Sequence, residues 1–348
     1  MTGYMKGLNL HGVGDLRYDD LPIPVPQSDE VLLKIKAVGI CGSDIPRVFV
    51  SGTYHFPTII GHEFAGVVAE TAPEDAKLKG KRASVFPLIP CHKCAACREG
   101  NFAQCVSYDY YGSRRDGAMA EYLAVKKENL CFLPDAVTYE EAAMNEPAAV
   151  AIHAFRRSGA QKGDTILIYG VGTVALLLAQ WAKAQGVKNI ILAARSDEKC
   201  AFAKNLGFPL TINVERDDLD KLVMEVTAGR GVEVAFEGTG QSLPWEKCLA
   251  LTQSFGTVVS LGNPVGDMSL SQKGYWRIMR QELRLVGTWN SSFGKLENDW
   301  RLALQAMSEK KLQPAALITH RFPLAEYTEA FGLMRDKREM FVKVMFCL

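Results

Sequence analysis

Residues 91–105 read Cys-His-Lys-Cys-Ala-Ala-Cys-Arg-Glu-Gly-Asn-Phe-Ala-Gln-Cys, and this run holds four of the nine cysteines of a 348-residue chain. Its thiols stand at Cys91, Cys94, Cys97 and Cys105. Zn²⁺ binds thiolates at about 2.3 Å, so a short loop can surround the ion only if its cysteines recur every few residues. The spacing therefore predicts a structural zinc site.

Two other interpretations of the cysteine cluster fit the chain less well. A thioredoxin-like redox pair, or cysteines buried for packing alone, would leave four clustered thiols unexplained in an otherwise cysteine-poor chain. A zinc ribbon that binds nucleic acid would normally bring a basic surface, whereas 40 Lys and Arg residues are balanced here by 39 Asp and Glu residues. The near-neutral charge gives no reason to expect a nucleic-acid or membrane partner.

Length and composition favour a cytoplasmic enzyme. The chain is long enough for two domains, and 48% hydrophobic with 23% charged residues is ordinary for a soluble protein. The first ten residues do not resemble a targeting segment, and no stretch reaches the roughly 18 unbroken apolar residues of a spanning helix. The cysteines outside the cluster are scattered and are expected to be reduced; they are Cys41, Cys131, Cys200, Cys248 and Cys347.

The hydrophobic pattern predicts two domains. Residues 1–155 predict short strands broken by Pro and Gly, as in a partly open β-barrel; examples are Glu30–Ile40, Phe64–Glu70, Lys81–Pro87 and Ala120–Ala124. Residues 156–297 predict strands that alternate with helices, and hence a parallel sheet covered on both faces. The strands are expected at Thr165–Tyr169, Asn189–Ala194, Leu210–Asn213, Glu233–Glu237, Thr257–Leu261 and Leu283–Thr288, and the helices at Thr173–Gln185, Leu219–Thr227, Leu243–Thr252 and Gly274–Gln281. Residues 298–348 are expected to resume the first domain, after a helix at Asp299–Glu309.

A glycine-rich turn joins the first strand and first helix of the second domain. Tyr169-Gly-Val-Gly-Thr-Val-Ala175 has the G-x-G-x-x-A spacing. Gly170 permits the tight turn, and Gly172 lets a pyrophosphate approach the backbone N–H groups at the helix start. Such turns also occur for structural reasons alone, but this one lies in a strand–helix–strand unit and so predicts a dinucleotide site. We expect the contacts to come from Gly170, Gly172, Thr173 and Val174.

A second group of metal-binding residue types lies upstream. Cys41 opens the run Cys-Gly-Ser43-Asp44, Gly61 precedes His62 and Glu63, and Glu146 stands before Pro147. One thiolate, one imidazole and one carboxylate make a three-ligand site with an open fourth position, as catalytic zinc requires. Each residue alone also has a structural explanation: core packing for the cysteine, a surface hydrogen bond for the histidine, and a turn for the glutamate.

With these motifs in this order, essentially the whole chain resembles the zinc-dependent medium-chain dehydrogenases, nearest the sorbitol dehydrogenase and galactitol-1-phosphate dehydrogenase branch. The resemblance implies a GroES-like β-barrel catalytic domain, with a structural zinc lobe at about residues 88–110, and a Rossmann dinucleotide-binding domain. It also implies two zinc ions per subunit and a homodimer or homotetramer. The catalytic zinc would be held by Cys41, His62 and Glu146, with Glu63 nearby, and the structural zinc by Cys91, Cys94, Cys97 and Cys105. Glutamate at 146, where alcohol dehydrogenases have cysteine, favours the polyol branch.

The expected reaction is hydride transfer between a secondary alcohol of a polyol or polyol phosphate and a nicotinamide cofactor. Zinc would lower the pKa of the substrate hydroxyl, and Ser43 would begin the proton relay unless it only caps the backbone. The expected substrate contacts are Arg47, Tyr54, Arg114, Arg115 and Asn290. The alternative for the arginines is binding of internal carboxylates or of cofactor phosphate. Alternative functions are a zinc dehydrogenase of another small alcohol, butanediol-like or threonine-like, a zinc-free reductase, and a non-catalytic relative.

The end of the second strand predicts NADP(H) rather than NAD(H). NAD-dependent relatives place an acidic residue there, about twenty positions after the glycine turn, to bind the ribose hydroxyls. Here Ala194 stands at that place, followed by Arg195 and Ser196, which can bind a 2′-phosphate, and Lys199 adds charge. The alternative is that Arg195 stacks on the adenine and Asp197 binds the ribose.

Overall fold

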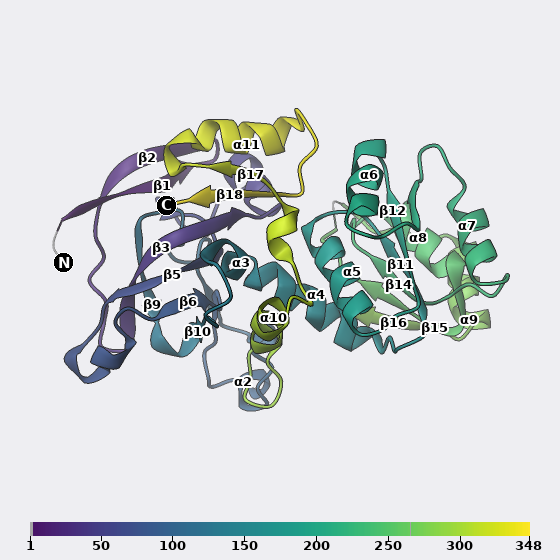
Figure 1. Ribbon diagram of the computed structural model, residues 1–348, viewed down its shortest axis with the longest axis horizontal. Helices are drawn as coiled ribbons and strands as arrows, with labels where there is room; N and C mark the ends of the chain where they lie inside the picture. Colours follow the sequence, from purple (N-terminus) through teal and green to yellow (C-terminus); the bar gives the residue numbers. More distant parts are fainter. Residues whose placement is uncertain (1–2, 265) are drawn as a thin grey trace. The chain divides into compact units, whose positions relative to one another are not determined.

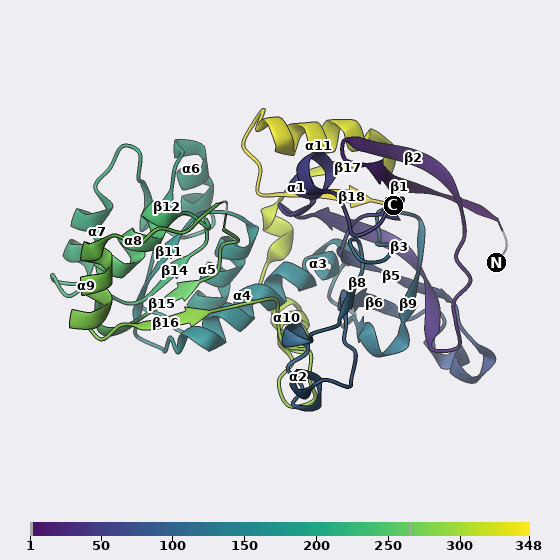
Figure 2. The same ribbon diagram turned by 180° about the vertical axis from the view of Figure 1, so that it is seen from behind.

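The computed structural model describes residues 3–264 and 266–348, and the chain forms two compact units (Figures 1 and 2). The first unit comprises Met1–Ala149 and Ser291–Leu348, and the second comprises Val150–Asn290. The boundary predicted at residue 155 falls inside helix α4 (Asn145–Ser158), which continues across the division. Because the hydrophobic pattern does not change within one helix, the sequence did not locate this division to the residue.

The first unit is built around a mainly antiparallel sheet whose central strand is β3 (Glu30–Ile40). Its order is β10-β6-β5-β3-β18-β17, with β9 also paired to β3. The other bounds are β5 Glu63–Glu70, β6 Arg82–Val85, β9 Tyr122–Lys126, β10 Leu130–Phe132, β17 Ile318–Phe322 and β18 Lys343–Cys347. Strand β18 pairs antiparallel with β3, with Val344 opposite Ile40, so the end of the chain completes the sheet that residue 30 begins.

Two smaller sheets and several short helices complete the first unit. One sheet has the order β2-β1-β4, from Asp15–Pro22, Tyr4–Gly12 and Thr58–Ile59, and the other pairs β7 (Leu88–Ile89) with β8 (Asp109–Tyr110). The helices are α1 Asp44–Pro46, α2 Ala95–Arg98, α3 Tyr139–Ala143, α10 Asp299–Ser308 and α11 Tyr327–Asp336. Single helical turns lie at Arg47–Ser51, Pro73–Leu78, Phe102–Gln104, Lys127–Asn129, Pro314–Leu317 and Leu324–Glu326. Helix α11 packs on the barrel, where the Phe331 ring lies 6.3 Å from that of Phe346 (Figure 1).

The second unit is a parallel sheet with helices between successive strands (Figure 2). Its order is β13-β12-β11-β14-β15-β16, which is 3-2-1-4-5-6 in chain order, the order of a doubly wound Rossmann sheet. The strands are β11 Thr165–Tyr169, β12 Asn189–Ala194, β13 Thr211–Asn213, β14 Val232–Glu237, β15 Thr252–Ser260 and β16 Arg284–Gly287. The helices are α5 Thr173–Ala184, α6 Asp197–Asn205, α7 Leu219–Val226, α8 Ser242–Leu251 and α9 Gln272–Arg280. All five residues of β11 are buried, and because alternate side chains face opposite sides, both faces of the sheet are covered there.

The predicted α/β class is confirmed: a β-barrel unit is followed by a doubly wound unit. Strands β11 and β12 have the predicted bounds, since buried parallel strands read as continuous apolar runs. The hairpin of β1 and β2 and helix α6 were not among the predicted elements. Within residues 3–264 and 266–348, no helix has the length and apolar character needed to cross a membrane.

Candidate functional site

The register of two neighbouring strands brings the first group of ligands together. Cys41 follows β3, and Glu63 begins β5, opposite Gly39 in the antiparallel pairing. A side chain at position 39 would place its Cβ 2.3 Å from the carboxylate of Glu63, so only glycine fits there. As a result one ligand atom each from Cys41, His62 and Glu63 lies within 4.8 Å of the others. Glu63 is the carboxylate in this group, and the predicted ligand Glu146 is not part of it, so the role of Glu146 as a zinc ligand stays a prediction.

Asp44 contacts two residues of this cluster, Cys41 and His62. Its fully buried carboxylate accepts a hydrogen bond from the backbone N–H of Cys41 at 2.9 Å. The same carboxylate forms an ion pair with Arg47. Its Oδ1 also lies 3.5 Å from Nδ1 of His62, a buried nitrogen with no hydrogen-bond partner among the described residues. A carboxylate behind one imidazole nitrogen is the usual arrangement when the other nitrogen binds a metal.

Glu146 and Tyr110 line the same site. Glu146, the second residue of α4, is buried, and this burial raises its pKa to about 7 against the opposing effect of His62. The Tyr110 ring lies 5.7 Å from the imidazole of His62, and burial raises the pKa of its hydroxyl well above the ordinary value, with Glu146 adding to the rise. Both groups therefore face the metal ligands in a medium of low polarity.

The charges of the site favour a divalent cation. Four acidic groups surround it and two basic groups balance them, which leaves an excess of two negative charges when all are ionised. Burying uncompensated charge is costly, so one bound Zn²⁺ would neutralise the site. The acidic groups are Cys41, Asp44, Glu63 and Glu146, and the basic groups are Arg47 and Lys343. Together with the donor set of one thiol, one imidazole and carboxylates, this balance fits catalytic zinc.

The four predicted structural ligands meet in a separate lobe of the first unit. Cys91, Cys94, Cys97 and Cys105 each offer a sulfur, and these sulfurs lie within 4.8 Å of one another. The Sγ atoms of Cys91 and Cys97 are 3.9 Å apart. Tetrahedral zinc with bonds of about 2.3 Å would set its sulfurs about 3.8 Å apart, so the cluster has the size that zinc requires.

Backbone N–H groups point at these sulfurs and stabilise thiolates. The N–H of Cys91 donates to Sγ of Cys105 at 3.3 Å, and the N–H of Lys93 donates to Sγ of Cys91 at 3.5 Å. Backbone hydrogen bonds from Cys97 and Val106 lower the pKa of Cys94 to about 6. Burial raises the pKa of Cys97 to about 12, and hydrogen bonding with the thiols of Cys105 and Cys94 adds to the rise. The lobe thus suits a metal that binds all four thiolates at once.

In the second unit, the glycine turn has the geometry that was expected of a dinucleotide site. Gly170 follows β11 with φ of +114°, a conformation that favours glycine. Gly172 precedes α5 as its N-cap, and a Cβ built there meets nothing within 4 Å. Open space beside the first N–H groups of a twelve-residue helix suits a pyrophosphate.

The end of β12 presents the residues that were predicted to choose between cofactors. Ala194 is its buried last residue, Arg195 is exposed beyond it, and Ser196 caps α6 by accepting the N–H of Lys199 at 3.3 Å. Asp197, the alternative ribose ligand, already accepts hydrogen bonds from Asn213 at 3.0 Å and Arg216 at 2.9 Å. Asp197 is therefore engaged within the protein, and binding of a 2′-phosphate by Arg195 stays a prediction.

The three arginines that were predicted to bind substrate have different partners in the structure. Arg47 is paired with the buried Asp44, and Arg115 with Asp109 at 3.0 Å and Glu30 at 3.8 Å. These two arginines therefore satisfy internal carboxylates, which was the alternative interpretation.

Arg114 has a different environment. Its guanidinium lies 4.1 Å from the ring centre of Tyr54 and 4.5 Å from that of Tyr108, and it donates to the Tyr54 hydroxyl at 3.1 Å. The Tyr108 ring in turn lies 6.3 Å from that of Tyr110, which faces His62. The arginine is thus held between two aromatic rings, and ring contacts through Tyr108 and Tyr110 connect it to His62. Asn290 is the last residue of the second unit, and its substrate contact stays a prediction.

Sequence analysis missed Lys343, Tyr108 and Tyr110. Lys343 begins β18 and is almost fully buried, with an ion pair to Glu63. A lone lysine within the apolar run Phe341-Val-Lys-Val-Met-Phe346 was the available signal, because lysine is rarely buried without a partner. The tyrosines gave no comparable signal in the sequence.

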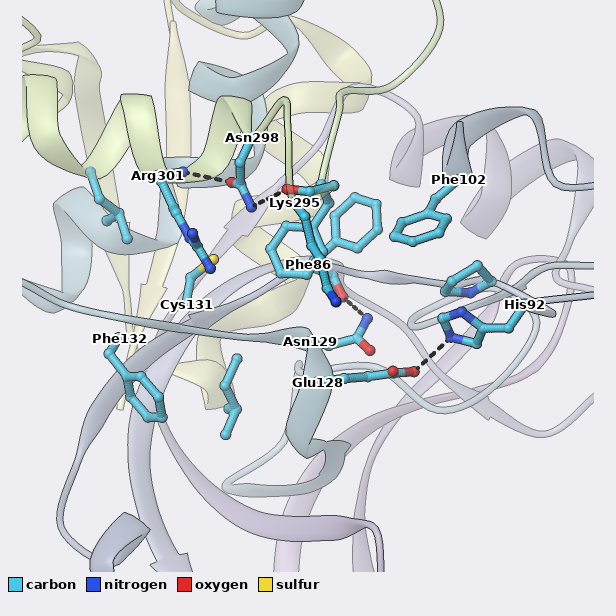
Figure 3. A pocket seen from close by; sticks show the side chains of 15 residues that line it. Phe86, His92, Phe102, Glu128, Asn129, Cys131, Phe132, Lys295, Asn298 and Arg301 are labelled. Atoms are coloured by element: carbon cyan, nitrogen blue, oxygen red, sulfur yellow. Dashed lines mark hydrogen bonds and ion pairs between the residues drawn. The ribbon is translucent and has the colours of Figure 1, made fainter. Parts of the chain in front are cut away.

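A cavity of about 660 Å³ lies elsewhere in the first unit, beside the structural zinc lobe. Figure 3 shows Phe86, Phe102 and Phe132 around it, with Lys295 from the segment that precedes α10 and Arg301 from α10 itself. None of the predicted site residues lines this cavity. It is therefore separate from both groups of candidate metal ligands.

Comparison with known proteins agrees with this architecture. The alcohol dehydrogenase GroES-like domain matches residues 27–135, and the zinc-binding dehydrogenase domain matches residues 170–309. The chain therefore belongs to the zinc-dependent medium-chain dehydrogenases, with a GroES-like domain and a Rossmann domain, and it is an oxidoreductase.

Individual relatives place it in the polyol branch of that family. It is 33% identical to galactitol 1-phosphate 5-dehydrogenase of Escherichia coli over 91% of this chain and 92% of the relative. The crystal structure of that E. coli enzyme superposes with a TM-score of 0.92 at 32% identity, covering 99% of this chain and 100% of the other. D-arabitol-phosphate dehydrogenase of Enterococcus avium is 32% identical over 99% of this chain and 98% of its own. A zinc-binding dehydrogenase of Sinorhizobium meliloti, solved with NADP, is 27% identical with a TM-score of 0.90, covering 99% and 100% of the two chains.

Proposed function

We propose that this protein oxidises a secondary alcohol of a polyol or polyol phosphate to the ketose with NADP⁺, and catalyses the reverse reduction with NADPH. The observation that carries the proposal is the convergence of Cys41, His62 and Glu63 within 4.8 Å, in a chain of the zinc-binding dehydrogenase family. The names of its relatives, which act on galactitol 1-phosphate and arabitol phosphate, support the substrate class.

The catalytic zinc would be held by Cys41, His62 and one carboxylate. Glu146 is the predicted third ligand, and Glu63 is the carboxylate that lies within ligand distance of the other two. Zinc at this position would act as a Lewis acid on the substrate oxygen, while the nicotinamide would take or give the hydride. Asp44 holds the imidazole of His62 in orientation, and the partly buried Ser43 hydroxyl next to Cys41 can pass a proton from the substrate towards water.

NADP(H) is the proposed cofactor. Support comes from the absence of an acid at Ala194, from the exposed Arg195 beside it, and from the engagement of Asp197 with Arg216. The S. meliloti relative solved with NADP supports the same choice.

We further propose a cytoplasmic homodimer or homotetramer. The scattered free cysteines support a reducing compartment. Strand β16 lies at the edge of the second unit's sheet, with Leu285 46% exposed and Trp289 beyond it 54% exposed. An edge strand with exposed apolar side chains is suited to pairing with a second copy.

The metal content and a substrate panel test the proposed function together. The purified protein should contain two zinc ions per subunit, and Cys41→Ala or His62→Ala should lose one ion and all turnover while keeping the circular dichroism spectrum. Cys347→Ala, a thiol outside both clusters, is the matched control and should keep both ions. Polyols and their phosphates are then assayed with NADP⁺ and with NAD⁺. The highest kcat/KM should be obtained with NADP⁺. A single zinc in the unmodified protein, or full activity of Cys41→Ala, would refute the proposal.

A further inference from the structure

Lys343 connects the last strand of the chain to the metal cluster. It is 3% exposed, and its ammonium group donates to Oε2 of Glu63 and to the backbone carbonyl of Ile40, the latter at 3.1 Å. The register of β18 against β3 places Val344 opposite Ile40, so the lysine is fixed by the sheet rather than by a loop. Its aliphatic chain also packs against Gly39, where a Cβ would lie 3.4 Å from Cδ of Lys343.

Two buried carboxylates border a site that needs only one. Cys41 and His62 provide two ligands, and Glu63 and Glu146 are each 8% exposed or less beside them. If both carboxylates bound the metal, four protein ligands would fill a tetrahedral zinc, which is the arrangement of structural rather than catalytic sites. A catalytic site therefore requires that one of the two carboxylates be kept from binding the ion.

We propose that Lys343 is a positioning residue that keeps one zinc coordination position open for the substrate, by holding Oε2 of Glu63 in a buried ion pair. This inference rests on the proposed function, because it requires zinc at Cys41 and His62. The bond to the Ile40 carbonyl fixes the ammonium group, and the steric limit at Gly39 fixes the carboxylate from its other side. With Oε2 engaged by the ammonium group and its negative charge compensated, Glu63 is a weaker competitor for the metal, so binding of Glu63 as a fourth protein ligand is disfavoured.

Lys343→Met removes the charge and keeps most of the buried volume. Glu63, left without its partner, should turn to the metal as an additional ligand. Transfer of zinc from the holoenzyme to the chelator 4-(2-pyridylazo)resorcinol should then be about tenfold slower for the catalytic ion, and kcat/KM should fall by roughly 10- to 100-fold, the usual range for partners of metal ligands. The protein should still contain two zinc ions. Lys343→Arg keeps the charge and should restore most of both values.

Three further variants make the outcome decisive. In Glu63→Gln/Lys343→Met the freed side chain is a poor ligand, so the zinc release rate should return to that of the unmodified protein. Lys311→Met removes a lysine from an exposed ion pair with Glu309, and it should change neither rate nor activity. Cys41→Ala identifies which phase of zinc release belongs to the catalytic ion.

An unchanged or faster release of catalytic zinc in Lys343→Met would overturn the inference and leave the proposed function intact. Retention of both zinc ions in Cys41→Ala would instead defeat the proposed function itself. If Lys343→Met does not fold, Lys343→Gln, which keeps a donor without the charge, takes its place in the same measurement with the same expected and opposing results.

Discussion

At the scale of single residues, Arg195 and Ala194 are predicted to set the preference between NADP(H) and NAD(H). Arg195→Ala should weaken NADP(H) binding by about 1.5–3 kcal/mol, the value of a charge-assisted hydrogen bond, and leave NAD(H) nearly unchanged. Ala194→Asp should shift the preference towards NAD(H), because a carboxylate there repels the 2′-phosphate. Dissociation constants from fluorescence titration check both, with the exposed Arg230→Ala as control. A preference of the unmodified enzyme for NAD(H) would contradict the assignment.

The lowered pKa of Lys199 predicts that the preference for NADP(H) over NAD(H) depends on pH. Burial lowers its pKa to about 8, so its ammonium group is charged at pH 7 and neutral well above pH 8. The 2′-phosphate, with a second pKa of about 6, is a dianion throughout this range. The ratio of NADP(H) to NAD(H) affinity should therefore fall up to roughly tenfold as the pH rises from about 7 to 9.5, the value of one charged contact. Lys199→Arg should flatten the profile, and a profile that is the same in both proteins would exclude the role of Lys199.

Arg114 carries the prediction on substrate phosphate, since Arg47 and Arg115 are engaged by internal carboxylates. Arg114→Gln should lower kcat/KM for a polyol phosphate by about tenfold or more, the cost of one charge-assisted hydrogen bond, and leave the free polyol unaffected. Arg114→Lys should recover part of the loss, because it keeps the charge but not the planar group held between Tyr54 and Tyr108. Equal efficiency of the unmodified enzyme on a polyol and its phosphate would remove the basis of this prediction.

At the scale of elements, the four-cysteine lobe around α2 has few buried side chains of its own. Of its four cysteines only Cys97 and Cys105 are buried, and the other side chains of α2 include the exposed Arg98. Zinc binding by such a loop is itself folding free energy. Cys97→Ala should therefore lose one zinc per subunit and lower Tm, by roughly 3 °C for each 2 kcal/mol lost in a protein of this size.

The matched experiment for the lobe is chelation. Treatment of the unmodified protein with a strong chelator should lower Tm to about that of Cys97→Ala once the structural ion has left, and added zinc should restore it. Cys347→Ala, outside the lobe, should retain both ions and the original Tm. If Cys97→Ala kept both ions with an unchanged Tm, the lobe would not be a zinc site.

At the scale of the whole molecule, the exposed apolar side chains at β16 predict where two copies of the chain associate. Leu285→Lys would place a charge on the apolar edge of the second unit's sheet, and charged edge residues block strand pairing. The molar mass from light scattering should fall towards that of the monomer, 38.3 kDa. Val25→Lys changes a residue 80% exposed in the first unit and should leave the mass unchanged. A monomeric unmodified protein would rule out the proposed oligomer.

The sequence by itself determined those features in which neighbours along the chain act together. The spacing of Cys91, Cys94, Cys97 and Cys105 predicted one cluster, because ligands a few residues apart meet without any help from the rest of the fold. The run Thr165–Tyr169 and the turn at Gly170 were predicted for the same reason: buried parallel strands are continuous apolar runs, and the turn needs a glycine.

Only the tertiary structure decided the contacts between distant residues. Lys343 meets Glu63 across 280 positions of sequence, through the pairing of β18 and β5 with the two sides of β3. Arg47 and Arg114 are the same residue type, and no local pattern separates them. One is neutralised by the buried Asp44 and the other is held between tyrosine rings because strand register and packing place those partners there. Pairing register is a long-range property, so the sequence alone could not show that Glu63 lies beside Cys41 and His62, or that Arg47 is paired with Asp44 while Arg114 lies between tyrosine rings.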